Sequence, residues 1–336
     1  MTLSFAGDLL VHEPVWQRAL ELGGGEYDFE PMFEPLRGLV ERADISFCHL
    51  ETPMTSAPPQ GYPVFNTPPQ VADAVEATGW DACSTASNHS LDQGLEGIAE
   101  NVRILDKAGI EHTGTSAQSG ERSDAAVLRA EGMRVALLSY TTDTNGLPVT
   151  EPASVNLADP RQMLADAERA RREGADAVIV NIHWGSAMVP EYVGEPNPAQ
   201  RGLVDELLSS QAITAVVGQG PHVVGPLEVR DGRGIVYSEG NLISNQGSAS
   251  GLAAESQDGL IALLTLVDRR GQRPTVSAAR YVPIYTTQPE YVVEPVGRAL
   301  SRGRLDPTLA RASYERTVEV AGRSEQVRPL PGGLGG

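Results

Sequence analysis

The chain contains a single lysine, Lys107, so nearly all of its positive charge is carried by arginine. Its 336 residues include 26 basic and 44 acidic side chains, which gives a formal net charge of −18 at pH 7. A protein that binds phosphate backbones needs dense patches of Lys and Arg, and a field of this sign repels polyanions. We therefore expect no nucleic-acid partner.

Long apolar runs are missing as well. The sequence has no stretch of 18 apolar residues, so we expect no integral membrane segment. The first apolar stretch is too short for a signal peptide and lacks its basic flank. As written, the sequence is that of a cytoplasmic protein; a chain trimmed of an export signal would read the same and would be extracytoplasmic.

Only two cysteines are present, Cys48 and Cys83, each in an apolar stretch with the pattern of a strand. Neither CxxC nor Cys/His finger spacing occurs, so we expect both to be buried free thiols. A cysteine nucleophile is disfavoured by the same burial. The serine-hydrolase pattern GxSxG and the phosphate-binding pattern GxxxxGKS/T are also absent.

What the sequence does contain is an alternation of strand-like and helix-like segments. A stripe of four apolar residues at helical spacing over 95–105 predicts a helix that ends near Gly109. Asp159 before Pro160 predicts the start of another helix, which runs to about Gly174. Strands that alternate with helices predict an α/β fold. Short apolar runs typical of strands lie at 3–6, 45–48, 82–85, 135–138, 177–182, 212–217 and 234–237.

The pattern changes from about Asp258. Two predicted strands, 260–266 and 275–284, follow each other without a helix, and one capped helix begins at Asp306. We expect an antiparallel or mixed second sheet here. We divide the chain into a main domain over 1–286 and an extension over 287–336 that packs on its outside, with the Gly-rich last residues, 331–336, disordered.

Polar side chains recur where the predicted strands end. Ligands of open α/β sheets bind beyond the carboxyl ends of the strands, so these groups can meet in one crevice. Neutral imidazole with carboxylate and amide oxygens is the ligand set expected for Zn, Mn or Fe. Two such ions need about six to eight donors, which this inventory nearly supplies, and that favours metal-assisted hydrolysis. The groups are Asp8, Glu51, Asn88, His89, His183, His222 and Asn241.

At these motifs the sequence resembles the CapA family, named for a capsule poly-γ-glutamate synthesis protein and related to the calcineurin-like metallophosphoesterases. The resemblance implies a four-layer α/β/β/α sandwich of two mixed sheets with the site at the strand ends. It covers about residues 3–245 and rests on six motifs in order: Gly7-Asp8, Leu50-Glu51-Thr52-Pro53, Ser87-Asn88-His89-Ser90-Leu91-Asp92-Gln93-Gly94, His183-Trp184-Gly185, Pro221-His222-Val223 and Glu239-Gly240-Asn241.

The family pattern implies one or two divalent ions, Mn, Fe or Zn, at these residues. Asp8 and His222 would bind the first ion, and Asn88 and His183 the second. Glu51 would bridge the two.

The same pattern implies that His89 protonates the leaving group, oriented by Asp92; a structural hydrogen bond is the alternative for His89. Three departures from the pattern leave a weakened second site, a single ion or a loss of hydrolase activity open. His12 follows Asp8 by four residues rather than two, Gly220 stands where relatives have a histidine, and Ala187 stands where they often have a glutamate.

Five further residues are candidates for the substrate side of the crevice: His12, His49, Trp184, Gln219 and Asn241. Structural capping is an equal alternative for His49 and Asn241, and packing is the favoured one for Trp184. Gln219 could also fill the gap that Gly220 leaves. The Pro-rich loop over 56–69 is long enough to act as a lid.

We interpret the chain as a CapA-like metal-dependent hydrolase. Metal-bound hydroxide would attack a phosphoester, or an amide of a glutamyl or peptide-like substrate, either a small molecule or an anionic chain. The alternative is a non-catalytic accessory subunit of poly-γ-glutamate or other polymer synthesis and export, with a degenerate metal site.

Overall fold

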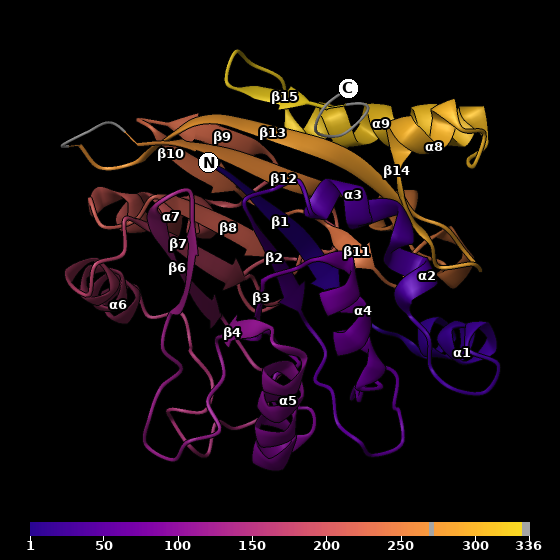
Figure 1. The fold of residues 1–336 in the computed structure, drawn as a ribbon, viewed down its shortest axis with the longest axis horizontal. Coiled ribbons are helices and arrows are strands. Elements are labelled where there is room, and N and C mark those ends of the chain that lie inside the picture. The colour runs from indigo at the N-terminus through magenta and orange to yellow at the C-terminus, as the bar shows by residue number, and fades with distance from the viewer. Residues whose placement is uncertain (269–271, 331–336) are drawn as a thin grey trace.

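The computed structural model of the chain describes residues 1–268 and 272–330, and the end predicted to be disordered, 331–336, lies outside them. Two β-sheets lie between layers of helices (Figure 1). Within the described residues, the first sheet has nine strands, with the path β14 (Val293–Pro295), β13 (Thr275–Thr286), β12 (Asp258–Val267), β1 (Thr2–Leu9), β2 (Ile45–Leu50), β3 (Ala82–Ser84) and β4 (Glu111–Thr113), while β11 (Asn241–Ile243) joins β1 and β15 (Val327–Pro329) joins β13. Since β1 is parallel to β2 and antiparallel to β12, this sheet is mixed.

The second sheet has six strands in the same described part of the chain. Four are parallel, and one antiparallel strand pairs at each edge. Its order is β5 (Ala126–Ala130), β6 (Met133–Thr141), β7 (Ala177–His183), β8 (Ala215–Gln219), β10 (Arg233–Val236) and β9 (Leu227–Arg230). Each apolar run predicted as a strand overlaps one of these fifteen strands. The expectation that β12 and β13 build a second sheet is wrong, because β12 pairs along β1 and extends the first sheet.

Helices cover the outer face of each sheet, which confirms the predicted four-layer α/β/β/α sandwich. The first sheet is covered by α1 (Glu13–Leu22), α2 (Glu30–Phe33), α3 (Arg37–Val40), α4 (Gln70–Thr78) and α5 (Gly94–Ala108), with a 3-10 turn at Glu34–Leu36. The second is covered by α6 (Pro160–Arg172) and α7 (Pro198–Ser209). The last helices, α8 (Val296–Ser301) and α9 (Pro307–Ala321), pack on β13 along the upper edge of Figure 1. Two more 3-10 turns lie at Ser248–Ser250 and Ala254–Gln257.

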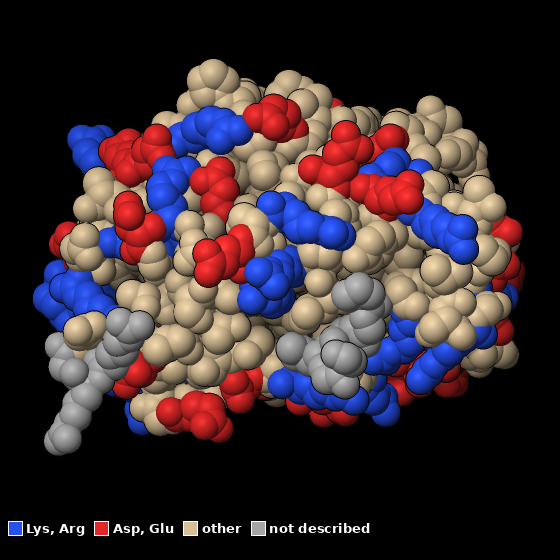
Figure 2. All heavy atoms as spheres, turned by 90° about the horizontal axis from the view of Figure 1, so that it is seen from above, with Lys and Arg blue, Asp and Glu red and all other residues tan. Residues whose placement is uncertain are grey.

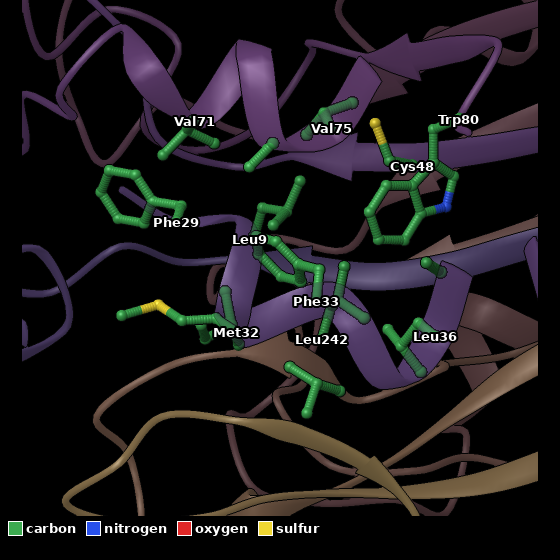
Figure 3. Packing of buried hydrophobic residues seen from close by; sticks show 14 of the residues in the cluster. Leu9, Phe29, Met32, Phe33, Leu36, Cys48, Val71, Val75, Trp80 and Leu242 are labelled. Carbon is green, nitrogen blue, oxygen red and sulfur yellow. The ribbon is translucent and has the colours of Figure 1, made fainter. Parts of the chain in front are cut away.

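Buried apolar side chains fill the spaces between the layers. Between the sheets, Phe5 stacks on Phe47 with ring centroids 5.0 Å apart. Between the first sheet and its helices, Phe33 meets Trp80 edge to face at 5.7 Å in the cluster that Figure 3 shows. Because the central strands are covered on both faces, their ends are where polar side chains can gather.

The helix signals in the sequence are largely confirmed. Asp159 and Asp306 cap α6 and α9 by accepting hydrogen bonds from backbone N–H groups two and three residues on. Helix α5 ends at Gly109, whose φ of 73° is the left-handed conformation of a helix C-cap. Of the predicted stripe on α5, Ile98 and Leu105 are buried as expected, whereas Leu95 is 43% exposed.

Cys48 and Cys83 form a disulfide, so the expectation of two free thiols is wrong. The two residues lie opposite each other on the neighbouring parallel strands β2 and β3, with Cα atoms 4.5 Å apart. That separation lies within the range of disulfides. Strand register creates the pair, and two cysteines without a known spacing pattern give no signal of it.

The surface carries charges of both signs. Figure 2 shows basic and acidic side chains interspersed on the face seen from above in Figure 1. Among the described residues, none of the helices combines the length and the apolar character needed to cross a membrane.

Candidate metal centre

Strand register brings one row of polar side chains together at the end of the first sheet. Asp8 of β1 pairs with His49 of β2 on one side and with Asn241 of β11 on the other. His49 pairs in turn with Ser84 of β3. Glu51 follows β2 directly and is buried. The carboxyl ends of β1, β2 and β3 therefore place a carboxylate, an imidazole and a hydroxyl side by side.

The second sheet contributes a facing row. His183 is the last residue of β7. After β8 the chain turns through Gly220 and His222, with φ values of 102° and 59°, and folds back toward Asp8. The Gly220 N–H donates to Asp8 Oδ2 at 3.4 Å. The two sheets meet where His49 Nε2 and His183 Nδ1 share a hydrogen bond of 2.9 Å.

Two overlapping groups of donor atoms result. Asp8, His49 and His183 form one group, and Asp8, Glu51 and His222 form the other; within each, the ligand atoms lie within 4.8 Å of one another. All five side chains are buried. Asp8 belongs to both groups, with Oδ2 3.0 Å from His222 Nδ1 and Oδ1 3.7 Å from His49 Nε2.

Several oxygens at this centre are buried without a hydrogen-bond partner. They are Asp8 Oδ1, both carboxylate oxygens of Glu51, and Asn88 Oδ1. A buried carboxylate oxygen without a partner is costly, so a cation that pairs with it is strongly favoured. Carboxylate, amide and imidazole donors suit Zn, Mn and Fe. The residues present therefore fit a divalent metal centre.

Burial and neighbouring charges shift the pKa values of this centre. Burial raises the pKa of Glu51 well above its usual range, and Asp8 raises it further, against the opposing effect of His222. Burial alone would lower the pKa of His222, but Glu51 and Asp8 raise it to about 10. Burial lowers the pKa of His183, and lowers that of His49 to about 3, so both imidazoles are neutral. Neutral imidazole is the form that binds metal.

The turn after β3 places Asn88 and His89 beside this centre. Asn88 Nδ2 donates to Asn145 Oδ1 at 3.3 Å. His89 Nδ1 lies 2.7 Å from Asp92 Oδ2, which also accepts from the Phe65 N–H at 2.7 Å. Because Asp92 carries no proton to donate when ionised, it favours hydrogen on Nδ1 of His89. This leaves Nε2 as the nitrogen that can exchange a proton with a bound molecule.

A pocket of about 720 Å³ lies next to the centre. Of the residues predicted from the sequence, it is lined by His12, Asn88, His89, Asp92 and His222. The predicted lid loop contributes residues 62–65. Sequence reasoning missed a second wall formed by residues 191–192 and 245–246, because neither segment follows a predicted strand or belongs to a polar motif. No Lys or Arg is among the described residues that line the pocket.

His12 lines the pocket but belongs to neither donor group. Its Nδ1 accepts a hydrogen bond from the Asn245 N–H at 3.2 Å and lies 3.1 Å from the Leu10 carbonyl oxygen. Its ring meets Phe65 edge to face at 5.3 Å. Burial lowers the pKa of His12 to about 4, so it is neutral near pH 7. Its place fits a contact with substrate better than one with a metal ion.

Four of the five substrate-side candidates do not line the pocket: His49 belongs to a donor group, and the other three are Trp184, Gln219 and Asn241. Trp184 is 1% exposed and donates from Nε1 to the Tyr237 carbonyl oxygen at 2.9 Å. Gln219 is held between the Asn181 amide and the Glu239 carboxyl, at 2.7 and 3.0 Å. Neither side chain has a free polar atom for a ligand.

Asn241, the third of these candidates, supports a histidine of the centre. Its Oδ1 lies 3.1 Å from His222 Nδ1, and its Nδ2 donates to Gln246 Oε1 and to the Ser256 carbonyl oxygen, both at 2.9 Å. These contacts fix the orientation of the His222 ring. Asn241 therefore acts on the centre through His222.

Trp184 should matter for stability rather than for binding. We expect Trp184→Ala to lower the free energy of unfolding by about 3–5 kcal/mol, because it empties a packed site and removes the donor of a buried carbonyl. Trp184→Phe should cost less, since the ring still fills most of the space. Urea unfolding of the metal-free protein measures both. An unchanged free energy of unfolding together with weaker substrate binding would show instead that Trp184 stacks on the substrate.

Comparison with known proteins shows the family of the chain. The model of the family described as "Bacterial capsule synthesis protein PGA_cap" matches residues 2–246. The chain belongs to this family. The "Capsule biosynthesis protein CapA" of Bacillus anthracis is 28% identical over 184 residues, and the "PGA biosynthesis protein CapA" of Bacillus subtilis is 25% identical over 257 residues. These matches cover 53% and 74% of this chain but only 43% and 64% of those relatives.

A further relative is the "Probable polyglutamine synthesis accessory protein" of Mycobacterium tuberculosis, 27% identical over 217 residues, which are 60% of this chain and 54% of that protein. The family match ends at residue 246, so β12, β13 and the last helices lie beyond it. All residues of both donor groups lie within the matched segment.

Solved structures show the same fold. A Staphylococcus aureus protein assigned as a 5′-nucleotidase superposes with a TM-score of 0.52 and 10% identity, covering 94% of this chain and 58% of that one. A hypothetical protein from Thermus thermophilus also gives 0.52, with 15% identity, covering 84% of this chain and 99% of that one. The chain shares the fold of these two proteins.

Proposed function

We propose that this chain is a metal-dependent hydrolase that acts on a phosphoester or on a glutamyl or peptide-like amide. One observation carries the proposal. Buried oxygens of Asp8 and Glu51 without hydrogen-bond partners lie beside the imidazoles of His49, His183 and His222, next to a pocket large enough for a small substrate. A purely structural role gives no reason to bury carboxylate oxygens unpaired.

The residues that would hold the ions are those of the family pattern, and four of them, Asp8, Glu51, His183 and His222, also belong to the donor groups. Asp8 and His222 would bind one ion, Asn88 and His183 the other, and Glu51 would bridge them. When bound, divalent ions lower the pKa of a water nucleophile and neutralise the charge that develops on the substrate. The protein contributes a fixed arrangement of donors and a pocket that shields them.

His89 is the residue we propose for proton transfer. It lines the pocket, and its Nδ1 is held by Asp92 Oδ2 at 2.7 Å. Phe65 packs its ring edge to face against His89 at 4.7 Å, which restricts the imidazole further. Held in this way, Nε2 would donate a proton to the oxygen or nitrogen of the leaving group.

The lining of the pocket bears on the substrate. With no Lys or Arg among the described lining residues, and with Glu191 on one wall, the protein offers no basic partner for a second anionic group. The apolar side chains of Tyr62, Phe65 and Leu147 suit a neutral or aromatic leaving group. We therefore propose a substrate that places no second anionic group against this lining. The names of the capsule and PGA biosynthesis relatives favour a glutamyl compound.

Chelation and reconstitution test this function. Protein loaded with Mn²⁺ or Zn²⁺ should hydrolyse at least one of p-nitrophenyl phosphate, bis-p-nitrophenyl phosphate and γ-glutamyl-p-nitroanilide. Removal of the ions with a chelator should abolish turnover, because the nucleophile and the charge neutralisation are lost together, and added metal should restore it. Turnover that survives complete chelation would contradict the proposal.

Two facts support a second candidate function. Gly220 offers no donor side chain where relatives have a histidine, and one relative is named an accessory protein. In that case the chain keeps the fold as a non-catalytic subunit of polymer synthesis or export. A fully metal-loaded protein that turns over none of the three substrates, and whose Glu51→Gln variant still supports polymer synthesis, would favour this function.

A further inference from the structure

We infer that His49 is a ligand of the second metal ion, in the place that a histidine at position 220 would otherwise fill. This inference rests on the proposed metal centre. Besides Glu51 and His183, that ion would then have a third carboxylate or imidazole ligand. The family pattern does not supply one in this chain, because Gly220 replaces the histidine. Asp8 would then contribute to both ions, since it belongs to both donor groups.

Position 220 cannot carry a side chain in this backbone. Gly220 has a φ of 102°, which disfavours any residue with a Cβ. A Cβ built there would collide with the Trp184 carbonyl oxygen and lie only 3.0 Å from His183 Nε2. The imidazole of His183 lies against the space where a side chain at 220 would start. A ligand for this side of the centre must therefore come from another strand.

His49 supplies such a ligand from the opposite sheet. Its Nε2 lies 2.9 Å from His183 Nδ1 and 3.7 Å from Asp8 Oδ1, and Asp8 Oδ1 has no hydrogen-bond partner. The two imidazole nitrogens are close enough to lie within reach of one ion, which would replace the hydrogen they share.

Ser84 fixes the ring of His49 for this role. Its hydroxyl lies 2.7 Å from His49 Nδ1, and the two residues pair in register on β3 and β2. A histidine that binds metal through one nitrogen commonly donates its other N–H to a second residue, and Ser84 Oγ can accept from His49 Nδ1. The contact holds Nε2 toward Asp8 and His183, because Nδ1 faces the opposite way across the ring.

The test counts ions in full-length protein loaded with excess Zn²⁺ and then desalted. Wild type should hold about two ions per chain by inductively coupled plasma mass spectrometry, and His49→Asn and His49→Ala about one. His112→Asn is the matched control, because His112 lies on β4 of the same sheet and contacts Asp106 rather than the centre. It should hold about two ions. Circular dichroism of the metal-free variants shows whether they are folded.

Ser84→Ala keeps the ligand and removes only its support. We expect it to bind two ions at saturation, with affinity for the second weakened by about 10–100-fold in calorimetric titration with Zn²⁺. Two ions of wild-type affinity in both His49 variants would overturn the inference and leave the proposed function intact. A wild-type protein that binds no ion would refute the metal centre itself.

Discussion

Glu51→Gln should reduce kcat/KM by about 10³-fold or more on any substrate that the wild type turns over. Both oxygens of the Glu51 carboxylate are buried without partners, and the side chain adjoins His222 and Asp8. Glutamine has nearly the same shape but lacks the charge and offers one oxygen instead of two. The ions therefore lose the group that we propose bridges them, and the metal content should fall as well.

In the absence of metal, the same variant should not lower the stability of the protein. A buried carboxyl with unpaired oxygens costs free energy, so the metal-free Glu51→Gln protein should unfold with an unchanged or higher free energy than wild type. Urea unfolding in the presence of a chelator measures this. A large loss of stability without metal would show that Glu51 serves the fold, and would contradict its role as a ligand.

His89→Ala should lower kcat by about 10²–10⁴-fold while leaving about two ions per chain. The imidazole lines the pocket and is held by Asp92, but it belongs to neither donor group. Its loss removes a proton donor and no metal ligand. Kinetics on phosphoesters with leaving groups of different pKa, together with metal analysis, measure both effects.

The dependence on the leaving group separates proton transfer from a structural role. A nitrophenolate departs without help, whereas an alkoxide needs a proton, so the loss in His89→Ala should be largest for the alkyl ester. Asp92→Asn should show a smaller loss of the same kind, because His89 remains but its orientation is weakened. Equal losses for all leaving groups would contradict the proton donor.

The strands and helix starts could be predicted because they are local features, whereas the four-layer arrangement is implied by the family resemblance. Apolar runs bounded by loops predict strands, and Asp159 and Asp306 mark helix starts through side-chain hydrogen bonds within three residues. The sheet that β12 and β13 join could not be predicted. Strand pairing depends on contacts between distant segments, and the disulfide of Cys48 and Cys83 arises from such a pairing.

From the sequence, the positions of the candidate site could be predicted only to within one or two residues along each strand. Parallel strands end at one edge of a sheet, which is why Asp8 and Glu51 come together. Side chains alternate between the two faces of a strand, so one position decides whether a residue meets the centre or the outer core. His183 faces the centre while the adjacent Trp184 is packed in the outer core, and both lie in one motif.

The most direct test of the account is a crystal structure of protein grown with Mn²⁺ or Zn²⁺, with anomalous scattering used to locate the ions. We predict two peaks per chain, both within bonding distance of Glu51, one beside Asp8 and His222 and the other beside Asn88 and His183. A metal-soaked crystal with no anomalous peak at these residues would contradict the central claim that their buried donors gather around bound cations.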